Sequence, residues 1–169
     1  MVSIIPYVSA MKNQKQTVFM QEAIRMAVEG VASGRGGPFG AVVVKEGQII
    51  GRGYNEVTSK NDPTAHAEMV AIREAAKTLG EFHLTGCELF TTCEPCPMCL
   101  AAIYWARIDR YYFGCTAQDA AAIEFADAFI HHELGVPPEK RTIPAVPLMR
   151  TEALSTFEAW KAKADRVRY

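Results

Sequence analysis

Two short stretches of the sequence carry side chains that are typical metal ligands. In NDPTAHAEMVAIREA, His66 and Glu68 stand two positions apart, where a loop leads into a predicted helix. In CEPCPMC, Cys96 and Cys99 have the Cys-x-x-Cys spacing at a predicted turn from strand to helix. Zinc favours thiolate sulfur and imidazole nitrogen in a tetrahedral set of ligands. The two stretches together therefore predict one zinc ion held by His66, Cys96 and Cys99.

Three protein ligands leave the fourth position of a tetrahedral zinc ion to water, as in catalytic zinc sites. Two thiolates and a neutral imidazole bring the ion to about zero net charge, and such an ion lowers the pKa of its water to about 7. The expected cofactor is thus Zn²⁺, one per subunit, with bound water or hydroxide. Glu68 begins the same predicted helix as His66, so it can lie beside this water without binding the metal. There it could take a proton from the water and pass it to a leaving amine.

Each stretch alone has a simpler explanation. A histidine at a helix start is often a cap or a surface residue, and a Cys-x-x-Cys pair can be a redox pair or half of a structural zinc site. Cys93 precedes Cys96 by three residues and so resembles the opening of an iron–sulfur motif. That motif needs a fourth cysteine followed by proline, which this sequence lacks. A structural zinc that also used Cys93 would leave Glu68 without a role, so the catalytic interpretation is favoured.

The composition indicates one globular domain that acts on a small substrate. The chain has 169 residues, of which 49% are hydrophobic and 22% charged, as in ordinary globular proteins. Its formal net charge is −1, whereas proteins that hold a long nucleic acid by its phosphates are usually more basic. We therefore expect a small-molecule partner, with no nucleic acid.

The N-terminus shows no targeting signal. No run of about 20 apolar residues exists, so no contact with a membrane is expected. The opening MVSIIPYVSAMKNQKQ has a short apolar patch, but Lys12 follows it, which is the wrong order for a secretory signal. Residues 1–16 are expected to form an N-terminal tail, possible disorder included. The five cysteines, three of them spaced by three, indicate metal binding or catalysis in place of disulfides, and a cytoplasmic location.

Helices and strands alternate along the rest of the chain. Apolar runs bounded by glycine, proline and polar residues predict strands, and longer periodic segments predict helices. The predicted helices cover residues 18–31, 65–80, 97–107, 120–134 and 155–166, and a break near Phe125 is an alternative for the fourth. The predicted strands cover residues 39–44, 48–55, 87–92, 109–114 and 145–150. This alternation predicts an α/β fold with a mixed sheet and helices on both of its faces.

The motifs HAE and PCPMC resemble those of the cytidine-deaminase-like superfamily of zinc deaminases, whose signature is H-x-E…P-C-x-x-C. GGPFGAVVV, NDPTAHAE, CEPCPMCLAAIYWAR and RTIP are in addition similar to motifs of bacterial guanine deaminases. The resemblance covers about residues 17–169. It implies one deaminase domain, a three-layer α/β/α sandwich around a five-stranded mixed sheet. It also implies hydrolysis of guanine to xanthine and ammonia in purine catabolism or salvage, and a homodimer that exchanges C-terminal segments.

The resemblance implies roles for individual residues. His66, Cys96 and Cys99 match the zinc ligands, and Glu68 and Asp127 match catalytic carboxylates. The substrate-binding residues that it implies are Asn55, Phe39, Ala67, Trp105 and Tyr169. An Asn side chain offers both a donor and an acceptor to a purine edge, and aromatic rings offer a flat face. The aromatic residues in this set fit core packing as well, and a residue at the very end of a chain is often poorly ordered.

One stretch, IEFAD, departs from the motif of the guanine deaminases. Glu124 stands where that motif has glycine, and Ala126 where it has the first of two acids, whereas Asp127 is retained. Because glycine can serve a tight bend, Glu124 calls the local path of the chain into question. A guanosine deaminase, or a deaminase of another small aminated ring, is therefore the first alternative. A tRNA adenosine deaminase is the second, disfavoured by GGPFGA and the near-neutral charge, and a zinc module without catalysis is the third.

Overall fold

The computed structural model describes the backbone of residues 5–168 and the side chains of residues 15–168. The chain divides into two compact units, Met1–Asp127 and Ala128–Tyr169. Within the described residues, no helix combines the length and the apolar character that crossing a bilayer requires.

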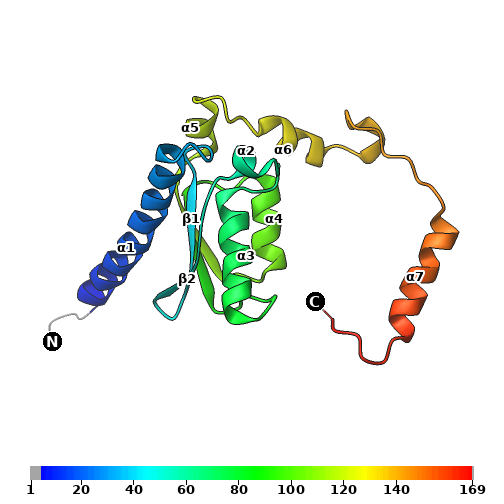
Figure 1. The fold of residues 1–169 in the computed structure, drawn as a ribbon, viewed down its shortest axis with the longest axis horizontal. Coiled ribbons are helices and arrows are strands. Elements are labelled where there is room, and N and C mark those ends of the chain that lie inside the picture. The colour runs from blue at the N-terminus through cyan, green and yellow to red at the C-terminus, as the bar shows by residue number, and fades with distance from the viewer. Residues whose placement is uncertain (1–4, 169) are drawn as a thin grey trace. The chain divides into compact units, whose positions relative to one another are not determined.

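The first unit is built around one mixed sheet of four strands in the order β2-β1-β3-β4 (Figure 1). The strands are β1 Gly40–Lys45, β2 Gln48–Tyr54, β3 Cys87–Cys93 and β4 Arg110–Cys115. β1 pairs antiparallel with β2 and with β3, whereas β3 and β4 run parallel. Glu46 and Gly47 turn the β1–β2 hairpin with φ of 52° and 79°, the sign that a two-residue hairpin turn of type I′ requires.

Helices cover both faces of this sheet, which gives the predicted layers (Figure 1). The helices of the first unit are α1 Ile5–Ala32, α2 Val57–Lys60, α3 Ala67–Leu79, α4 Pro97–Trp105 and α5 Ala117–Ala121. Successive residues of β1 point to opposite faces. Val42 belongs to a core cluster with Ala23 of α1, and Val43 to a second cluster with Ala71 of α3 and Ile103 of α4.

The backbone of α3 lies directly on β2. A Cβ atom added at Gly53 would lie 2.3 Å from the carbonyl oxygen of Ala67, closer than any side chain allows. Ala67 and Ala71 have no exposed surface, so the helix presents small side chains to the strand at these positions. This close approach fixes the N-terminal turn of α3, where His66 and Glu68 lie.

The sheet has one strand fewer, among the described residues, than the sequence predicts. The expected strand at 145–150 is wrong, because residues 144–149 have no regular secondary structure and α7 begins at Arg150. A strand needs a neighbour for its N–H and C=O groups, and the second unit holds no other strand in its described part. Pro147 in addition has no N–H to donate.

One helix differs from the prediction, and another follows its alternative. α1 includes residues 5–16, which the sequence predicts as a tail, and no glycine or proline follows Pro6 until Gly30. A run without either residue can continue as a helix. The predicted helix at 120–134 is broken near Phe125, as the alternative for this segment has it, with α5 ending at Ala121 and α6 beginning at Ala128.

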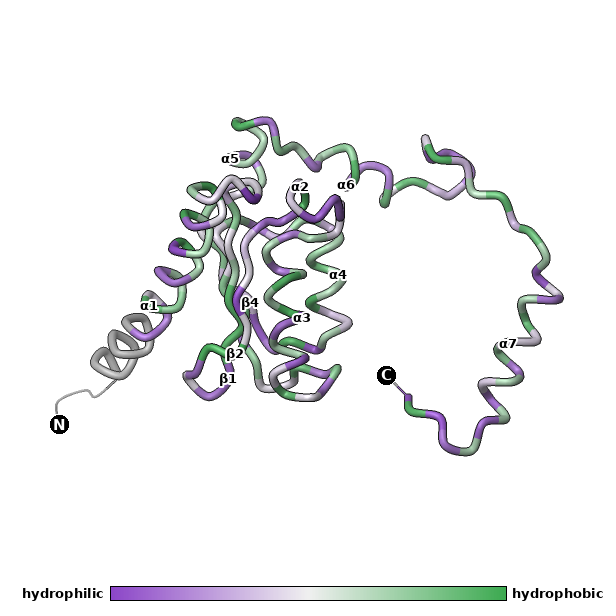
Figure 2. The backbone as a smooth tube through the Cα atoms, viewed as in Figure 1, coloured by the Kyte–Doolittle hydropathy of each residue, from purple (hydrophilic) through white to green (hydrophobic). Residues whose placement is uncertain are grey.

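The second unit consists of α6 Ala128–Gly135, the 3₁₀ helix η1 Pro138–Lys140 and α7 Arg150–Ala162. Hydrophobic residues recur along it (Figure 2), but none of its helices contains a buried residue. Local hydrogen bonds hold its centre, where the amide of Thr142 donates to the Glu133 carboxylate at 2.7 Å. Its exposed large apolar residues include Phe129, Leu134, Ile143, Val146, Leu148 and Phe157.

Replacing Gly53 by alanine should destabilise the first unit. The new methyl group would meet the backbone of α3, and such overpacking typically costs about 1–3 kcal/mol. Urea denaturation followed by circular dichroism would measure the free energy of unfolding. Gly135→Ala is the matched control, since no atom lies within 4 Å of a Cβ placed there. Equal stability of Gly53→Ala and the unmodified protein would mean that α3 is free to move away from the sheet.

Candidate active site

Three side chains of the types that bind metals meet where α3 and α4 begin and are called the metal-binding group below. His66 is the N-cap of α3 and Cys96 the N-cap of α4, and Cys99 is buried in the first turn of α4. His66 Nδ1 lies 3.5 Å from Cys96 Sγ and 3.6 Å from Cys99 Sγ. The three donor atoms all lie within 4.8 Å of one another. The two stretches that the sequence analysis singled out thus form one group in space.

The spacing of these atoms fits a zinc ion. Zinc lies about 2.3 Å from a thiolate sulfur and about 2.0 Å from an imidazole nitrogen. At tetrahedral angles, these bond lengths place sulfur and nitrogen roughly 3.5 Å apart. The two sulfur–nitrogen distances, 3.5 and 3.6 Å, agree with that separation. One nitrogen and two sulfur donors are also the ligand types that zinc prefers.

Local turns hold the two ligand-bearing helix starts in place. The Asp62 carboxylate accepts hydrogen bonds from the amide of Thr64 at 2.8 Å and from its hydroxyl at 2.7 Å, which closes the turn before His66. These bonds lower the pKa of Asp62, so the turn is held by a charged group. Pro97 occupies the first turn of α4, as predicted, because its missing N–H is not needed there.

The ligand group favours a thiolate at one cysteine. A hydrogen bond from the Cys99 thiol, assisted by one from His66, lowers the pKa of Cys96 to about 4. The same bond to Cys96, together with burial, raises the pKa of Cys99, so the pair shares one proton. The bond with Cys96 also raises the pKa of His66. A cation that displaced the shared proton would find the two sulfur atoms already facing each other.

Glu68 lies beside this group in a dry environment. Only 6% of the residue is exposed, and burial raises the pKa of its carboxyl group. One carboxylate oxygen accepts a hydrogen bond from the Thr91 hydroxyl at 3.1 Å, and the other lies 3.5 Å from Cys99 Sγ. The sequence analysis missed Thr91, whose signal is a polar residue at a buried position of β3. A fixed carboxyl group with a raised pKa is suited to carrying a proton.

Asn55 directly follows the last residue of β2, and Phe39 directly precedes the first residue of β1, so the two lie next to each other. The amide of Asn55 donates to the carbonyl oxygen of Phe39 at 3.0 Å. The Asn55 side chain is buried, and its oxygen accepts from the amides of Val57 at 3.2 Å and Gly37 at 3.5 Å. These bonds orient the side-chain amide, so its nitrogen, a donor, faces the other way.

A second aromatic ring, which the sequence analysis did not select, packs on Phe39. Phe125 meets it edge to face, with ring centroids 5.0 Å apart and planes at 85°. Gly37 leaves room for this ring, because a Cβ atom there would lie 3.1 Å from Phe125 Cζ. Phe125 therefore lies against Gly37, whose amide donates to the side-chain oxygen of Asn55.

The bend at Glu124 has the geometry that glycine favours. Glu124 has φ of 71°, in the left-handed region. The amide of Phe125 donates to Ala120 at 3.0 Å and that of Glu124 to Ala121 at 3.1 Å, the pair of bonds of a Schellman motif. The chain thus keeps a glycine-type path with a glutamate, at a cost of roughly 1–2 kcal/mol.

The other predicted residues lie at varied positions. Ala67 is fully buried in the first turn of α3, and Asp127 is half-buried after the Glu124 bend. Trp105 ends α4 with 70% of its surface exposed. Since a helix rises about 1.5 Å per residue, this position is about 9 Å along the axis from Cys99. Tyr169 lies outside the described residues.

Removal of one cysteine should separate a three-ligand site from one that also uses Cys93. The Cys93 thiol donates to the carbonyl oxygen of Thr116 at 3.5 Å, and Cys93 is not part of the donor group. Cys99→Ser should therefore lose most of its zinc, whereas Cys93→Ser should keep about the same amount as the unmodified protein. Metal analysis of the dialysed proteins gives the comparison. Loss of zinc from Cys93→Ser would mean that Cys93 is a fourth ligand and that the site is structural.

Known proteins share both the motifs and the fold. Residues 13–115 match the model of the cytidine and deoxycytidylate deaminase zinc-binding region. The chain is 52% identical to the guanine deaminase of Bacillus subtilis over 151 residues, which covers 89% of this chain and 97% of that protein. The X-ray structure of that guanine deaminase superimposes with a TM-score of 0.88 over 90% of this chain and 98% of the other. A tRNA-specific adenosine deaminase of Aquifex aeolicus is 46% identical over 95 residues, which is 56% of this chain and 62% of that protein.

Proposed function

The chain belongs to the cytidine and deoxycytidylate deaminase family of zinc-binding enzymes, and we propose that within it the protein hydrolyses guanine to xanthine and ammonia. The observation that carries this assignment is the 52% identity with a guanine deaminase over 89% of the chain. Similarity to two tRNA-specific adenosine deaminases is lower, at 41–46% identity over 56–70% of the chain. A cytoplasmic location and a role in purine catabolism or salvage are part of the same proposal.

In this proposal, His66, Cys96 and Cys99 bind one zinc ion per subunit. Zinc, when bound, acidifies a water molecule and so supplies hydroxide at neutral pH. Glu68 accepts a proton from the attacking water and delivers it to the departing amine, so that guanine and water give xanthine and ammonia. Thr91 supports this role, because its hydroxyl holds one oxygen of the Glu68 carboxyl group at 3.1 Å.

The remaining residues bind the purine. The side-chain nitrogen of Asn55 donates to an acceptor on the ring, and the Phe39 ring offers an apolar face. Asp127 is proposed as a second carboxylate, which stabilises or relays a proton on the side of the reacting carbon away from Glu68. Ala67 contacts the substrate through the start of α3. The proposed roles of Trp105 and Tyr169 as aromatic walls of the site stay predictions.

Ammonia release from a panel of aminated rings tests the substrate. We expect turnover of guanine and little turnover of guanosine, adenine, cytosine or cytidine. Glu68→Gln should lower kcat by about 10²–10⁴-fold and keep its zinc, because Glu68 is not a ligand.

A preference for guanosine would instead support a guanosine deaminase. Activity on tRNA alone would support a tRNA adenosine deaminase. Unchanged kcat in Glu68→Gln would remove Glu68 from the mechanism.

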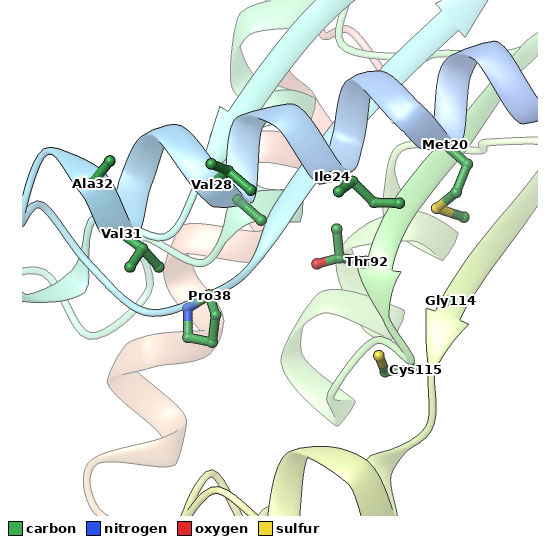
Figure 3. Close-up of a pocket in the computed structure, with 10 residues that line it drawn as sticks. Met20, Ile24, Val28, Val31, Ala32, Pro38, Thr92, Gly114 and Cys115 are labelled. Atoms are coloured by element: carbon green, nitrogen blue, oxygen red, sulfur yellow. The ribbon is translucent and has the colours of Figure 1, made fainter.

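The proposal includes a homodimer in which C-terminal segments are exchanged. The first unit carries an apolar groove of about 500 Å³ between α1 and the end of the last strand, β4 (Figure 3). Its lining includes Met20, Ile24, Val28, Val31, Pro38 and Cys115. The described part of the second unit has exposed apolar side chains and no buried ones. We propose that the C-terminal segment of one copy covers this groove on the other copy and contributes to the active site of that other copy.

A complementation experiment tests the shared site. Deletion of residues 157–169 should abolish turnover and leave zinc bound, since the metal-binding group lies in the first unit. A mixture of this truncated chain with full-length Glu68→Gln, refolded together, should regain activity. Its mixed dimers combine an intact Glu68 with an intact C-terminal segment. Full activity of the truncated chain alone would exclude a site that needs the C-terminal segment.

A further inference from the structure

Glu94 precedes the zinc-binding Cys96 by two residues, yet its exposed side chain is not part of the metal-binding group. It connects the loop between β3 and α4 to α5 instead. The amide of Glu94 donates to the carbonyl oxygen of Cys115 at 2.9 Å. The amide of Ala117, the first residue of α5, donates to Glu94 Oε2 at 3.2 Å. The same residue thus binds the end of β4 through its backbone and the start of α5 through its side chain.

The Glu94 side chain supplies a hydrogen-bond acceptor that the start of α5 lacks. The first amides of a helix have no partner within the helix. Thr116 and Asp119 form a capping box, in which the Thr116 side chain accepts from the amide of Asp119. The Ala117 amide is served by Glu94.

The other end of α5 leads directly to the aromatic contact. The Schellman motif at Glu124 fixes the direction in which the chain leaves the helix. One residue later, Phe125 packs edge to face on Phe39 and lies above Gly37. The amide of Gly37 in turn donates to the side-chain oxygen of Asn55. A continuous set of contacts therefore joins Glu94 to the residues proposed to bind the purine.

We propose that Glu94 is a positioning residue for substrate binding, which acts through the Ala117 amide and keeps Phe125 against Phe39. This role rests on the proposed function for its substrate and on the contacts above for its geometry. The Ala117 amide needs a side-chain oxygen at position 94 as its acceptor, and this oxygen need not carry a charge. Glutamine can therefore replace glutamate, whereas alanine cannot. Because Glu94 is exposed, water can hydrogen-bond to the freed amide, and global stability depends little on the side chain.

The test compares Glu94→Ala and Glu94→Gln with the unmodified protein, and uses Glu81→Ala as the matched control. Glu81 is an exposed carboxylate just beyond the other end of α3. Solvent competes for an exposed hydrogen bond, so its loss should weaken the attachment of α5 only moderately. We therefore expect Glu94→Ala to raise KM for guanine about tenfold with kcat within about threefold. Glu94→Gln and Glu81→Ala should stay within about threefold of the unmodified KM. Zinc content should be equal in all four proteins.

Hydrogen exchange gives a measure that needs no substrate. The amides of Glu124 and Phe125 should exchange faster in Glu94→Ala than in Glu94→Gln, because α5 loses its attachment only in the alanine variant. An unchanged KM in Glu94→Ala, an equal effect of glutamine and alanine, or loss of zinc would each overturn the positioning role. If the unmodified protein does not act on guanine, the proposed function fails, and the exchange rates still decide whether Glu94 holds α5.

Discussion

The contact between α3 and β2 determines where the reactive groups lie. Gly53 has no side chain, so the carbonyl group of Ala67 can approach the strand to a distance that any Cβ atom would prevent. His66 and Glu68 flank Ala67, and the height of both above the sheet follows from this contact. Thr91 on β3 can then reach the Glu68 carboxyl group. A small residue in a strand thus sets how close the turn that carries His66 and Glu68 lies to the sheet.

The second half of the metal-binding group comes from a βαβ unit. β3 and β4 run parallel and are connected by α4, so α4 begins beside the end of β3. Its N-cap, Cys96, lies 30 positions along the chain from His66, and the two side chains are nevertheless 3.5 Å apart. Both ligand-bearing turns are helix starts, where backbone N–H groups favour negatively charged sulfur. The architecture and the electrostatics of the site therefore have a common origin.

The sequence allowed prediction of those parts that depend on local chemistry. His66, Cys96 and Cys99 were found from ligand type and spacing, and the end of α3 at Gly80 from a turn residue with φ of 68°. Contacts between distant segments left no such local pattern. Phe125 lies 86 positions from Phe39, and nothing around either residue indicates that they meet. The predicted fifth strand failed for a related reason, since an apolar pattern does not reveal whether a pairing partner exists in the same chain.

The absence of buried side chains in residues 128–168 has a thermodynamic consequence. Hydrophobic burial is the main gain that offsets the loss of conformational entropy on folding. Covering the apolar groups of such a segment with another surface, as in the dimer proposed above, would therefore couple its folding to binding. By mass action, the order of this segment then rises with the concentration of whatever provides that surface. The sheet and the metal-binding group have a core of their own and do not share this dependence on concentration.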